Sequence, residues 1–445
     1  MGRPRVVSVF CGCGGLDYGF KQVGFDLTYA CDTDPAAVDC YSRNVDANVL
    51  VRDVQTAAFH DDVAELGRCD IVLGGFPCQG FSKAGPKRED DARNDLYAEM
   101  KRVVAKLQPR LFIAENVDGL TQNYRGAYLK KIIADFAQIG YAVDHRLLDA
   151  ASYGVPQHRR RIIFAGTRRD SPTFRWPDPT HNFKPRNGEF RIESGPSLFD
   201  IRDDRLATRL QSPVPIGDAI DDLLELDNGV PDHEVSPSWP KKYDRVFRRI
   251  EEGQKLCNVR HSATSVYTWE VPEVFGPVSE REVTVLETIS RHRRHKRYGD
   301  IPNGNPLPAD EIERLSRIQI ILPEISSLLE KGYLKEVTGK YDLKGAMFCS
   351  GLFKRPRWDE PSPTVLTNFH NPRYFLHPKR NRPFSLRECA RLQTFPDDFR
   401  FTSAKVSLVD GYRLVGNAVP PRLSAVFAEA ALQFLDIEEK VTVAL

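Results

Sequence analysis

Short apolar runs, separated by helical or polar segments, recur up to about residue 170 and constrain the fold most. They are residues 6–10, 26–31, 49–51, 70–73, 110–114 and 162–166. Runs this short and this continuously apolar are typical of strands buried on both faces of a parallel sheet. We therefore predict an α/β fold with a doubly wound, Rossmann-like sheet, whose ligands bind at the carboxyl ends of the strands.

The first run leads into a glycine-rich turn, Phe10-Cys11-Gly12-Cys13-Gly14-Gly15, ahead of a predicted helix. Such a turn lets a ligand approach the backbone and the helix N-terminus, although a tight turn without a ligand is the alternative. Asp17 stands where the dinucleotide pattern needs its third glycine, which disfavours an NAD-linked oxidoreductase. Asp32 or Asp34, after the second run, could hold ribose hydroxyls, and Asp53 could meet an adenine amino group. These positions favour an adenosine-containing ligand.

Reactive side chains follow three of the later runs. Cys78 lies in a loop between glycines at a strand end, where a thiol is exposed, although free cysteines are more often buried. Glu115 ends the next run and is a candidate acid, or a helix cap or ion-pair partner. Arg159 and Arg161 precede the run at 162 and would point to one face of a strand, unless this charge run is a solvated surface.

Composition limits the class of protein. A chain of 445 residues with 41% hydrophobic residues should form two domains, and its net charge of +2 says little about partners. The nine cysteines contain no C-x-x-C pair, which predicts a reducing cytoplasm and no structural metal. No apolar stretch is long enough for a membrane span, and no signal-peptide pattern is present.

The pattern of strands and helices stops near residue 170, and basic and aromatic residues become frequent. We predict a catalytic and cofactor-binding domain over 1–195, a second, smaller domain over 196–384, and a C-terminal segment, 385–445, that returns to the first.

Within the second domain, residues 286–345 suggest a winged-helix-like insert. We expect a helix over 311–322, a second helix from Pro323 to a cap at Gly332, and a hairpin over 333–343. The densest basic run of the chain lies here, and it would meet DNA phosphates or form a solvated loop. Its members are Arg291, Arg293, Arg294, Lys296 and Arg297.

Six motifs, in this order and at this spacing, make the chain resemble a DNA (cytosine-5)-methyltransferase of the bacterial restriction-modification type. They are F-x-G-x-G-G at 10–15, P-C-Q at 77–79, E-N-V at 115–117, Q-x-R-x-R at 157–161, R-E-x-A-R-L-Q at 387–393 and G-N-A-V-P-P at 416–421. The resemblance covers about 1–185 and 355–437 and leaves 195–350 unmatched. Asp32 stands where the family commonly has Glu.

The resemblance implies transfer of a methyl group from S-adenosylmethionine to C5 of a flipped-out cytosine in double-stranded DNA. Cys78 would add to C6 of the base, and Glu115 would act near N3. Arg159 and Arg161 would fix the base, the phosphate and the cysteine loop. Gln79 and Ser82 would contact DNA, and the segment 196–384 would recognise the target. The implied cofactor residues are Phe10, Gly12, Gly14, Gly15, Asp32, Asp53, Leu96 and Asn417.

The resemblance also implies a bacterial, cytoplasmic monomer, paired with a restriction endonuclease that acts on the same site. Two alternatives stay open: a tRNA cytosine-5 methyltransferase, which shares most of the motifs, and a catalytically inactive DNA-binding regulator on the same fold. The long recognition segment disfavours the first, and the intact motifs disfavour the second.

Overall fold

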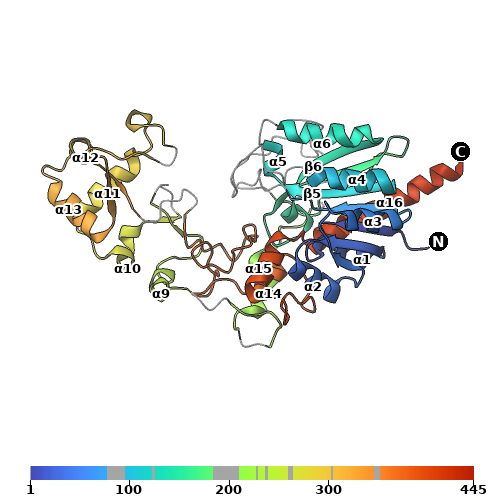
Figure 1. Ribbon diagram of the computed structural model, residues 1–445. Helices are drawn as coiled ribbons and strands as arrows, with labels where there is room; N and C mark the ends of the chain where they lie inside the picture. The colour runs from blue at the N-terminus through green and yellow to red at the C-terminus, as the bar shows by residue number, and fades with distance from the viewer. Residues whose placement is uncertain are drawn as a thin grey trace. The chain divides into compact units, whose positions relative to one another are not determined.

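Seven strands form the central sheet of the computed structural model, in the order β3-β2-β1-β4-β5-β7-β6 (Figure 1). The strands are β1 Arg5–Val9, β2 Asp26–Asp32, β3 Val49–Val51, β4 Ile71–Gly74, β5 Leu111–Val117, β6 Tyr141–Asp149 and β7 Arg160–Arg168. The structure describes residues 2–77, 96–122, 126–183, 210–226, 229–235, 239–258, 264–301, 304–344 and 351–444. The predicted α/β fold with a doubly wound sheet is confirmed.

Strands β1 to β5 are parallel because a helical crossover follows each of the first four. The crossovers contain α1 Gly15–Val23, α2 Pro35–Asn44, α3 Ala57–Glu65 and α4 Tyr97–Leu107, and α5 Gly119–Gln122 and α6 Ala127–Gln138 follow β5. Only the short helix η4, Ala150–Tyr153, separates β6 from β7, so β7 runs antiparallel to both of its neighbours. The start of β7 therefore lies at the edge where the parallel strands end, with Arg161 opposite Val117.

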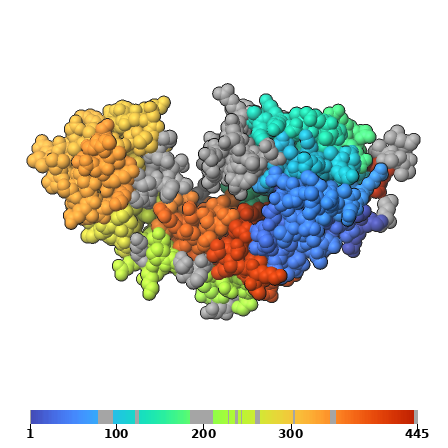
Figure 2. All heavy atoms as spheres, in the orientation of Figure 1, coloured from blue at the N-terminus to red at the C-terminus, as the bar shows by residue number. Residues whose placement is uncertain are grey.

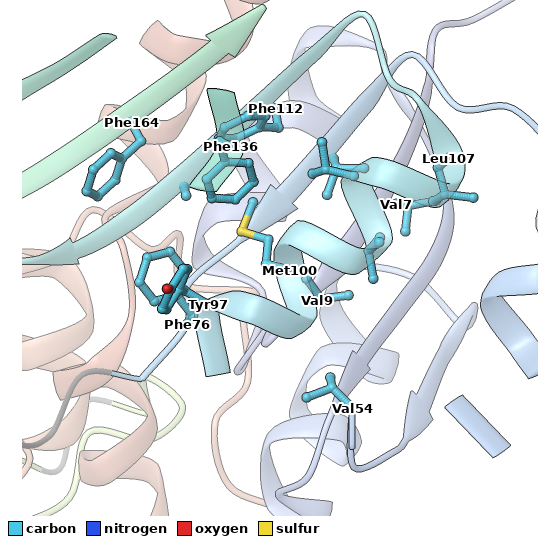
Figure 3. Close-up of a cluster of buried hydrophobic side chains, with 14 of the residues drawn as sticks. Val7, Val9, Val54, Phe76, Tyr97, Met100, Leu107, Phe112, Phe136 and Phe164 are labelled. Carbon is cyan, nitrogen blue, oxygen red and sulfur yellow. The ribbon is translucent and has the colours of Figure 1, made fainter. Parts of the chain in front are cut away.

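One face of the sheet is closed by a core under α3, α4 and α6 (Figure 3). Met100 of α4 is fully buried there, and the rings of Phe112 and Phe136 stack with centroids 4.4 Å apart. Phe76, just after β4, packs against Tyr97 at the start of α4. The core thus fixes the backbone on both sides of the segment 78–95, which contains Cys78 and lies outside the described residues.

Helix α1 packs against α16, Pro421–Ala444, which lies near the other end of the sequence. A Cβ atom on Gly19 would be 2.4 Å from the backbone nitrogen of Ala425, so the two helices touch through their backbones. The hydroxyl of Ser424 also donates a hydrogen bond to the carbonyl of Leu16. Early and late parts of the sequence, blue and red in Figure 2, accordingly meet in this part of the molecule.

The chain divides into two compact units. The first comprises Met1–Glu234, Asp359–Thr367 and Leu386–Leu445, and the second Val235–Trp358 and Asn368–Ser385. Outside the sheet, the first unit contains α8 Ile216–Ile220, η5 Asp221–Leu223, α14 Leu386–Leu392 and α15 Leu408–Asn417. The predicted boundary at residue 195 lies outside the described residues, and the assignment of functions to the domains stays a prediction.

The described residues of the second unit form two apolar cores. One surrounds Phe247, Leu256 and Phe353, and the other joins the helices and hairpin between residues 269 and 343. Its elements are α9 Lys242–Phe247, β8 Lys255–Leu256, β9 Ser265–Val266, η6 Thr268–Glu270, α10 Pro272–Phe275, α11 Glu280–His292, η7 Lys296–Tyr298, α12 Ala309–Ser316, α13 Leu322–Lys331, β10 Leu334–Val337 and β11 Lys340–Leu343.

The expected single helix over 311–322 was wrong at its end. Helix α12 stops at Ser316, because Arg317 adopts a left-handed φ of 60°, and Leu322 instead begins α13. The cap at Gly332, with φ 86°, and the antiparallel hairpin turning at Thr338 and Gly339 are present as expected.

Candidate active site

The carboxyl edge of the sheet brings together the start of the Cys78 loop and the end of β5. Asn116 donates a hydrogen bond of 3.0 Å to the carbonyl of Phe76. A Cβ atom built on Gly75 would be 3.6 Å from the carbonyl oxygen of Phe10 and 4.0 Å from Oε2 of Glu115. The loop therefore begins between the glycine-rich turn and Glu115. Cys78, Gln79 and Ser82 themselves lie outside the described residues.

Glu115 and Arg161 form an ion pair across neighbouring strands. Nε of Arg161 is 2.5 Å from Oε1 of Glu115, and the two side chains are 13% and 12% exposed. Glu115 lies near the end of β5, as the sequence suggested, and stands opposite Ile163. Arg161 also donates a hydrogen bond to the carbonyl of Arg160. The pair leaves Oε2 of Glu115 on the side of Gly75.

Arg159 is fully buried and holds protein backbone. Its guanidinium donates hydrogen bonds to the carbonyls of Val365, at 3.1 Å, and Gly416, at 3.0 Å. Burial, and then the nearby Arg161, lower the pKa of Arg159 well below its usual value. The structure thus brings Arg159 near Arg161, but ties it to the end of α15 instead of exposing it to a base or a phosphate.

A buried pair of glutamines, to which the sequence assigned no role, joins the same segments. Nε2 of Gln157 donates to Oε1 of Gln393 at 3.0 Å, and Oε1 of Gln157 accepts from the backbone of Val365 at 2.8 Å. Gln393 in turn donates to the carbonyl of Val415. Buried amides need such partners. Both glutamines belong to motifs that the sequence analysis identified, which could have marked them as important. The sequence alone could not show that the two side chains bind each other.

The turn after β1 requires its glycines. Gly12 and Gly14 have φ angles of 55° and 89°, which favour glycine. A Cβ atom on Gly15 would be only 2.2 Å from the carbonyl oxygen of Val419. Phe10, with φ 56°, is a non-glycine residue in the left-handed region, a conformation that often marks functional sites.

Asp32 closes this turn from β2. Its Oδ2 accepts a hydrogen bond from the backbone of Gly12 and its Oδ1 one from Asp34, both at 2.9 Å. Burial raises the pKa of Asp32. The backbone of Thr33 also hydrogen-bonds this carboxylate. A carboxylate has about four acceptor sites, so it can accept a further hydrogen bond, which suits a hydroxyl of a ribose. Asp34, the alternative, caps α2 at Ala36 and pairs with Arg413.

The other predicted cofactor residues come from three more elements. Asp53 is exposed after β3, and its carboxylate accepts a hydrogen bond from the backbone amide of Gln55. Leu96 precedes α4 and packs partly buried against the core, and Asn417 is the exposed last residue of α15. Gly416, its neighbour, is the residue that Arg159 binds.

Asp17 is a buried carboxyl group that sequence reasoning used only to exclude the dinucleotide pattern. Its Oδ1 accepts a hydrogen bond of 3.1 Å from the hydroxyl of Tyr41, and burial raises its pKa to about 6. A Cβ atom on Gly14 would be 2.7 Å from the ring of Tyr41. Asp17 therefore holds the ring that packs on the glycine-rich turn.

The predicted basic run spans the end of α11 and η7 in the second unit, and one of its members must be corrected. Arg293 is fully buried in an ion pair of 2.9 Å with Asp342 of β11, so its guanidinium cannot meet a phosphate. Arg291 pairs with Glu287, and Arg297 with Glu311, while both stay about half or more exposed. Arg294 and Lys296 are exposed as well.

In the described part of the chain, no cluster of three His, Cys, Asp or Glu side chains could bind a metal ion. None of the described helices has the length and apolar character needed to cross a membrane.

Comparison with known proteins gives consistent relatives over the whole chain. The family model of C-5 cytosine-specific DNA methylases matches residues 4–433. The Type II methyltransferase M.AgeI of Thalassovita gelatinovora is 31% identical over 432 residues, 96% of this chain and 98% of that protein. M.XorII of Xanthomonas oryzae pv. oryzae is also 31% identical, over 95% and 83%. A crystal structure of a protein encoded within a prophage of E. coli shares the fold, with a TM-score of 0.53, 22% identity and coverage of 97% and 99%.

Proposed function

The chain belongs to the C-5 cytosine-specific DNA methylase family, and we propose that it is the modification enzyme of a restriction-modification system. It is a DNA (cytosine-5)-methyltransferase that uses S-adenosylmethionine. The tRNA methyltransferase and the inactive regulator are not favoured, because the matched family and the curated relatives are DNA methyltransferases. The contact of Arg161 with Glu115, next to the start of the Cys78 loop, supports the assignment of the site most directly.

S-adenosylmethionine supplies an electrophilic methyl group on a sulfonium. The glycine-rich turn fits this cofactor, because no described atom lies within 4 Å of the place where a Cβ atom of Gly12 would be, which leaves its backbone open to a ligand. We assign Gly14 and Gly15 to the cofactor as well, and their missing side chains let the turn pack tightly against the protein. Asp32, which already holds the backbone of the turn, would accept a further hydrogen bond from a ribose hydroxyl. The remaining residues that we assign to the cofactor are Phe10, Asp53, Leu96 and Asn417.

The protein's own residues must make C5 of cytosine nucleophilic, since the free base reacts poorly there. In the proposed mechanism the thiolate of Cys78 adds to C6, and negative charge develops on the ring. Glu115 holds a proton at N3, which lowers the barrier as the charge develops. After methylation the C5 proton leaves to a base, the C6–S bond breaks, and the thiolate of Cys78 is regenerated.

Arg161 and Arg159 have different tasks in this proposal. Arg161 orients Glu115 through Oε1 and leaves Oε2 for the base. Arg159 is buried and positions the backbone around it, because its guanidinium donates hydrogen bonds to the carbonyls of Val365 and Gly416. None of these groups can reach a cytosine inside a stacked duplex, so the base must be flipped out, at a cost of a few kcal/mol.

Replacement of the nucleophile tests the function. Cys78→Ala should abolish transfer of radiolabelled methyl groups to DNA while DNA binding survives, because the thiolate makes the covalent bond to the base. A duplex containing 5-fluorocytosine should trap the wild-type protein, since fluorine cannot leave as a proton does. Cys69→Ala, which alters another thiol of the same unit, should still be trapped. Turnover by Cys78→Ala, or the absence of a wild-type adduct, would overturn the assignment.

We assign target recognition to residues 196–384. The catalytic motifs lie outside this range, and the second unit lies within it apart from its last residue. A chimera that carries this segment on a related catalytic half should methylate the site of the donor. An active chimera that keeps the specificity of its host would contradict the assignment. The proposed setting is a bacterial cytoplasm, with the protein acting as a monomer beside an endonuclease of the same specificity.

A further inference from the structure

His158 stands between two residues of the Q-x-R-x-R motif and has no role in the mechanism above. It lies two residues before β7, at the edge of the sheet where β5 ends. Its Nδ1 atom is 2.5 Å from Oδ2 of Asp149, the last residue of β6. Because a carboxylate holds one nitrogen of the imidazole, the direction in which the other ring nitrogen points is fixed.

The burial of the pair fixes that direction. The side chain of Asp149 is 3% exposed, and that of His158 is 40% exposed. The other oxygen of Asp149 accepts hydrogen bonds from the backbone of Ala151, at 3.1 Å, and of Arg159, at 3.2 Å. Nδ1 of His158 therefore faces inward to a buried carboxylate that the backbone holds in place, and the exposed part of the ring is the side away from Nδ1.

The backbone around His158 is equally constrained. Its amide donates to the carbonyl of Ser362 at 2.7 Å, and its carbonyl accepts from the hydroxyl of Thr364 at 2.7 Å. The ring of Phe183 lies 5.3 Å from the imidazole, centroid to centroid. The side chain thus projects from a rigid segment, three residues from Arg161.

The chemistry of the exposed side identifies its ligand. In a protonated imidazole both nitrogens donate, so Nδ1 binds Asp149 and Nε2 can donate outward to an anion. The anion that must pass this edge is the DNA backbone, because a cytosine that reaches Glu115 and Arg161 carries its flanking phosphates with it. We propose that His158, oriented by Asp149, binds a DNA phosphate beside the flipped cytosine. This proposal rests on the methyltransferase function.

Salt dependence of DNA binding tests the contact. His158→Asn removes Nε2 but keeps an amide that can donate to Asp149, whereas His158→Lys keeps a cation. The probe is a fluorescent duplex with the site that bisulfite sequencing identifies for the wild type. The slope of log K against log salt should fall by about one unit for His158→Asn and stay near the wild-type value for His158→Lys. His158→Gln, which is also neutral, takes the place of His158→Asn if that variant does not fold.

His60 provides a matched control. It is 38% exposed and pairs with Glu99 at 3.2 Å, but it lies in the middle of α3. His60→Asn should leave the slope unchanged. An unchanged slope in His158→Asn would overturn the proposal, and so would a loss of methyl transfer without a change in binding, which would make the imidazole a proton acceptor. If the wild type itself transfers no methyl group, the proposed function fails first, and the two failures are distinguished.

Discussion

Arg161 holds one oxygen of Glu115, and the other faces Gly75: Nε of the arginine is 2.5 Å from Oε1, whereas a Cβ atom on Gly75 would be 4.0 Å from Oε2. The two residues come from antiparallel neighbours, β7 and β5, so the register of the sheet sets their contact. A carboxyl group fixed in this way is pre-oriented toward Gly75, which precedes Cys78 by three residues in the sequence. Preorganised polar groups of this kind lower a barrier without having to reorganise during the reaction.

Glu115→Gln should retain the shape of the site and lose the transferable proton. We expect kcat to fall about a hundred-fold or more, since general acid catalysis typically contributes that much. The affinity for S-adenosylmethionine, measured by calorimetry, should change little. A variant with normal kcat and weaker cofactor binding would contradict the catalytic role of Glu115 and would indicate that it binds the cofactor.

Asp32→Ala should show the opposite behaviour. Loss of the carboxylate removes the acceptor proposed for the ribose and the bond to Gly12, so cofactor binding should weaken while kcat at saturation is nearly retained. Asp34→Ala is the control, because that carboxylate is occupied by Ala36 and Arg413. Equal loss of cofactor affinity in both variants would mean that the effect comes from folding.

The basic run should separate into surface and structural members. Replacing exposed Arg294 and Lys296 with Ser should reduce the salt slope of DNA binding by about one unit for each lost phosphate contact, without changing the methylated site. Arg293→Ser should instead leave Asp342 buried without its main partner and cost about 3 kcal/mol or more of stability. An unchanged slope in the first variant would identify the run as a solvated loop.

Asp17 should make stability depend on pH in mildly acidic solution. Its pKa is about 6 in the folded protein, against an ordinary value of 3.8, so folding stabilises the protonated form. That stabilisation is complete below about pH 4 and is lost as the pH rises through about 6. Asp17→Asn removes this pH dependence. As the pH rises over this interval, the free energy of unfolding of the variant should therefore increase by about 3 kcal/mol relative to that of the wild type. Urea unfolding at several pH values measures the difference, and parallel curves for the two proteins would contradict it.

Local patterns predicted the sheet and the positions of the motifs, but not the contacts between distant segments. The apolar runs match six of the seven strands. Strand β6 was missed because most of its residues are only partly buried or exposed, and the last run forms β7, which is antiparallel instead of parallel. Arg293 and Arg294 look alike in the sequence, and only the hairpin that brings Asp342 beside the first one separates them. The periodicity that extended a helix to Leu322 missed the turn at Arg317, since backbone conformation there overrides the apolar spacing. The bonds of Arg159 to Val365 and Gly416 likewise depend on tertiary packing.

The packing of α1 on α16 has a consequence for the order in which the protein matures during synthesis. Helix α16 follows α1 by about 400 residues, which corresponds to roughly 20 seconds or more of translation at typical rates. Until then the surface of α1 around Gly19 is uncovered, and Gly15 lacks the neighbouring carbonyl of Val419. The glycine-rich turn therefore reaches its final form only after α16 has been made, so a growing polypeptide that still lacks α16 should not yet modify DNA.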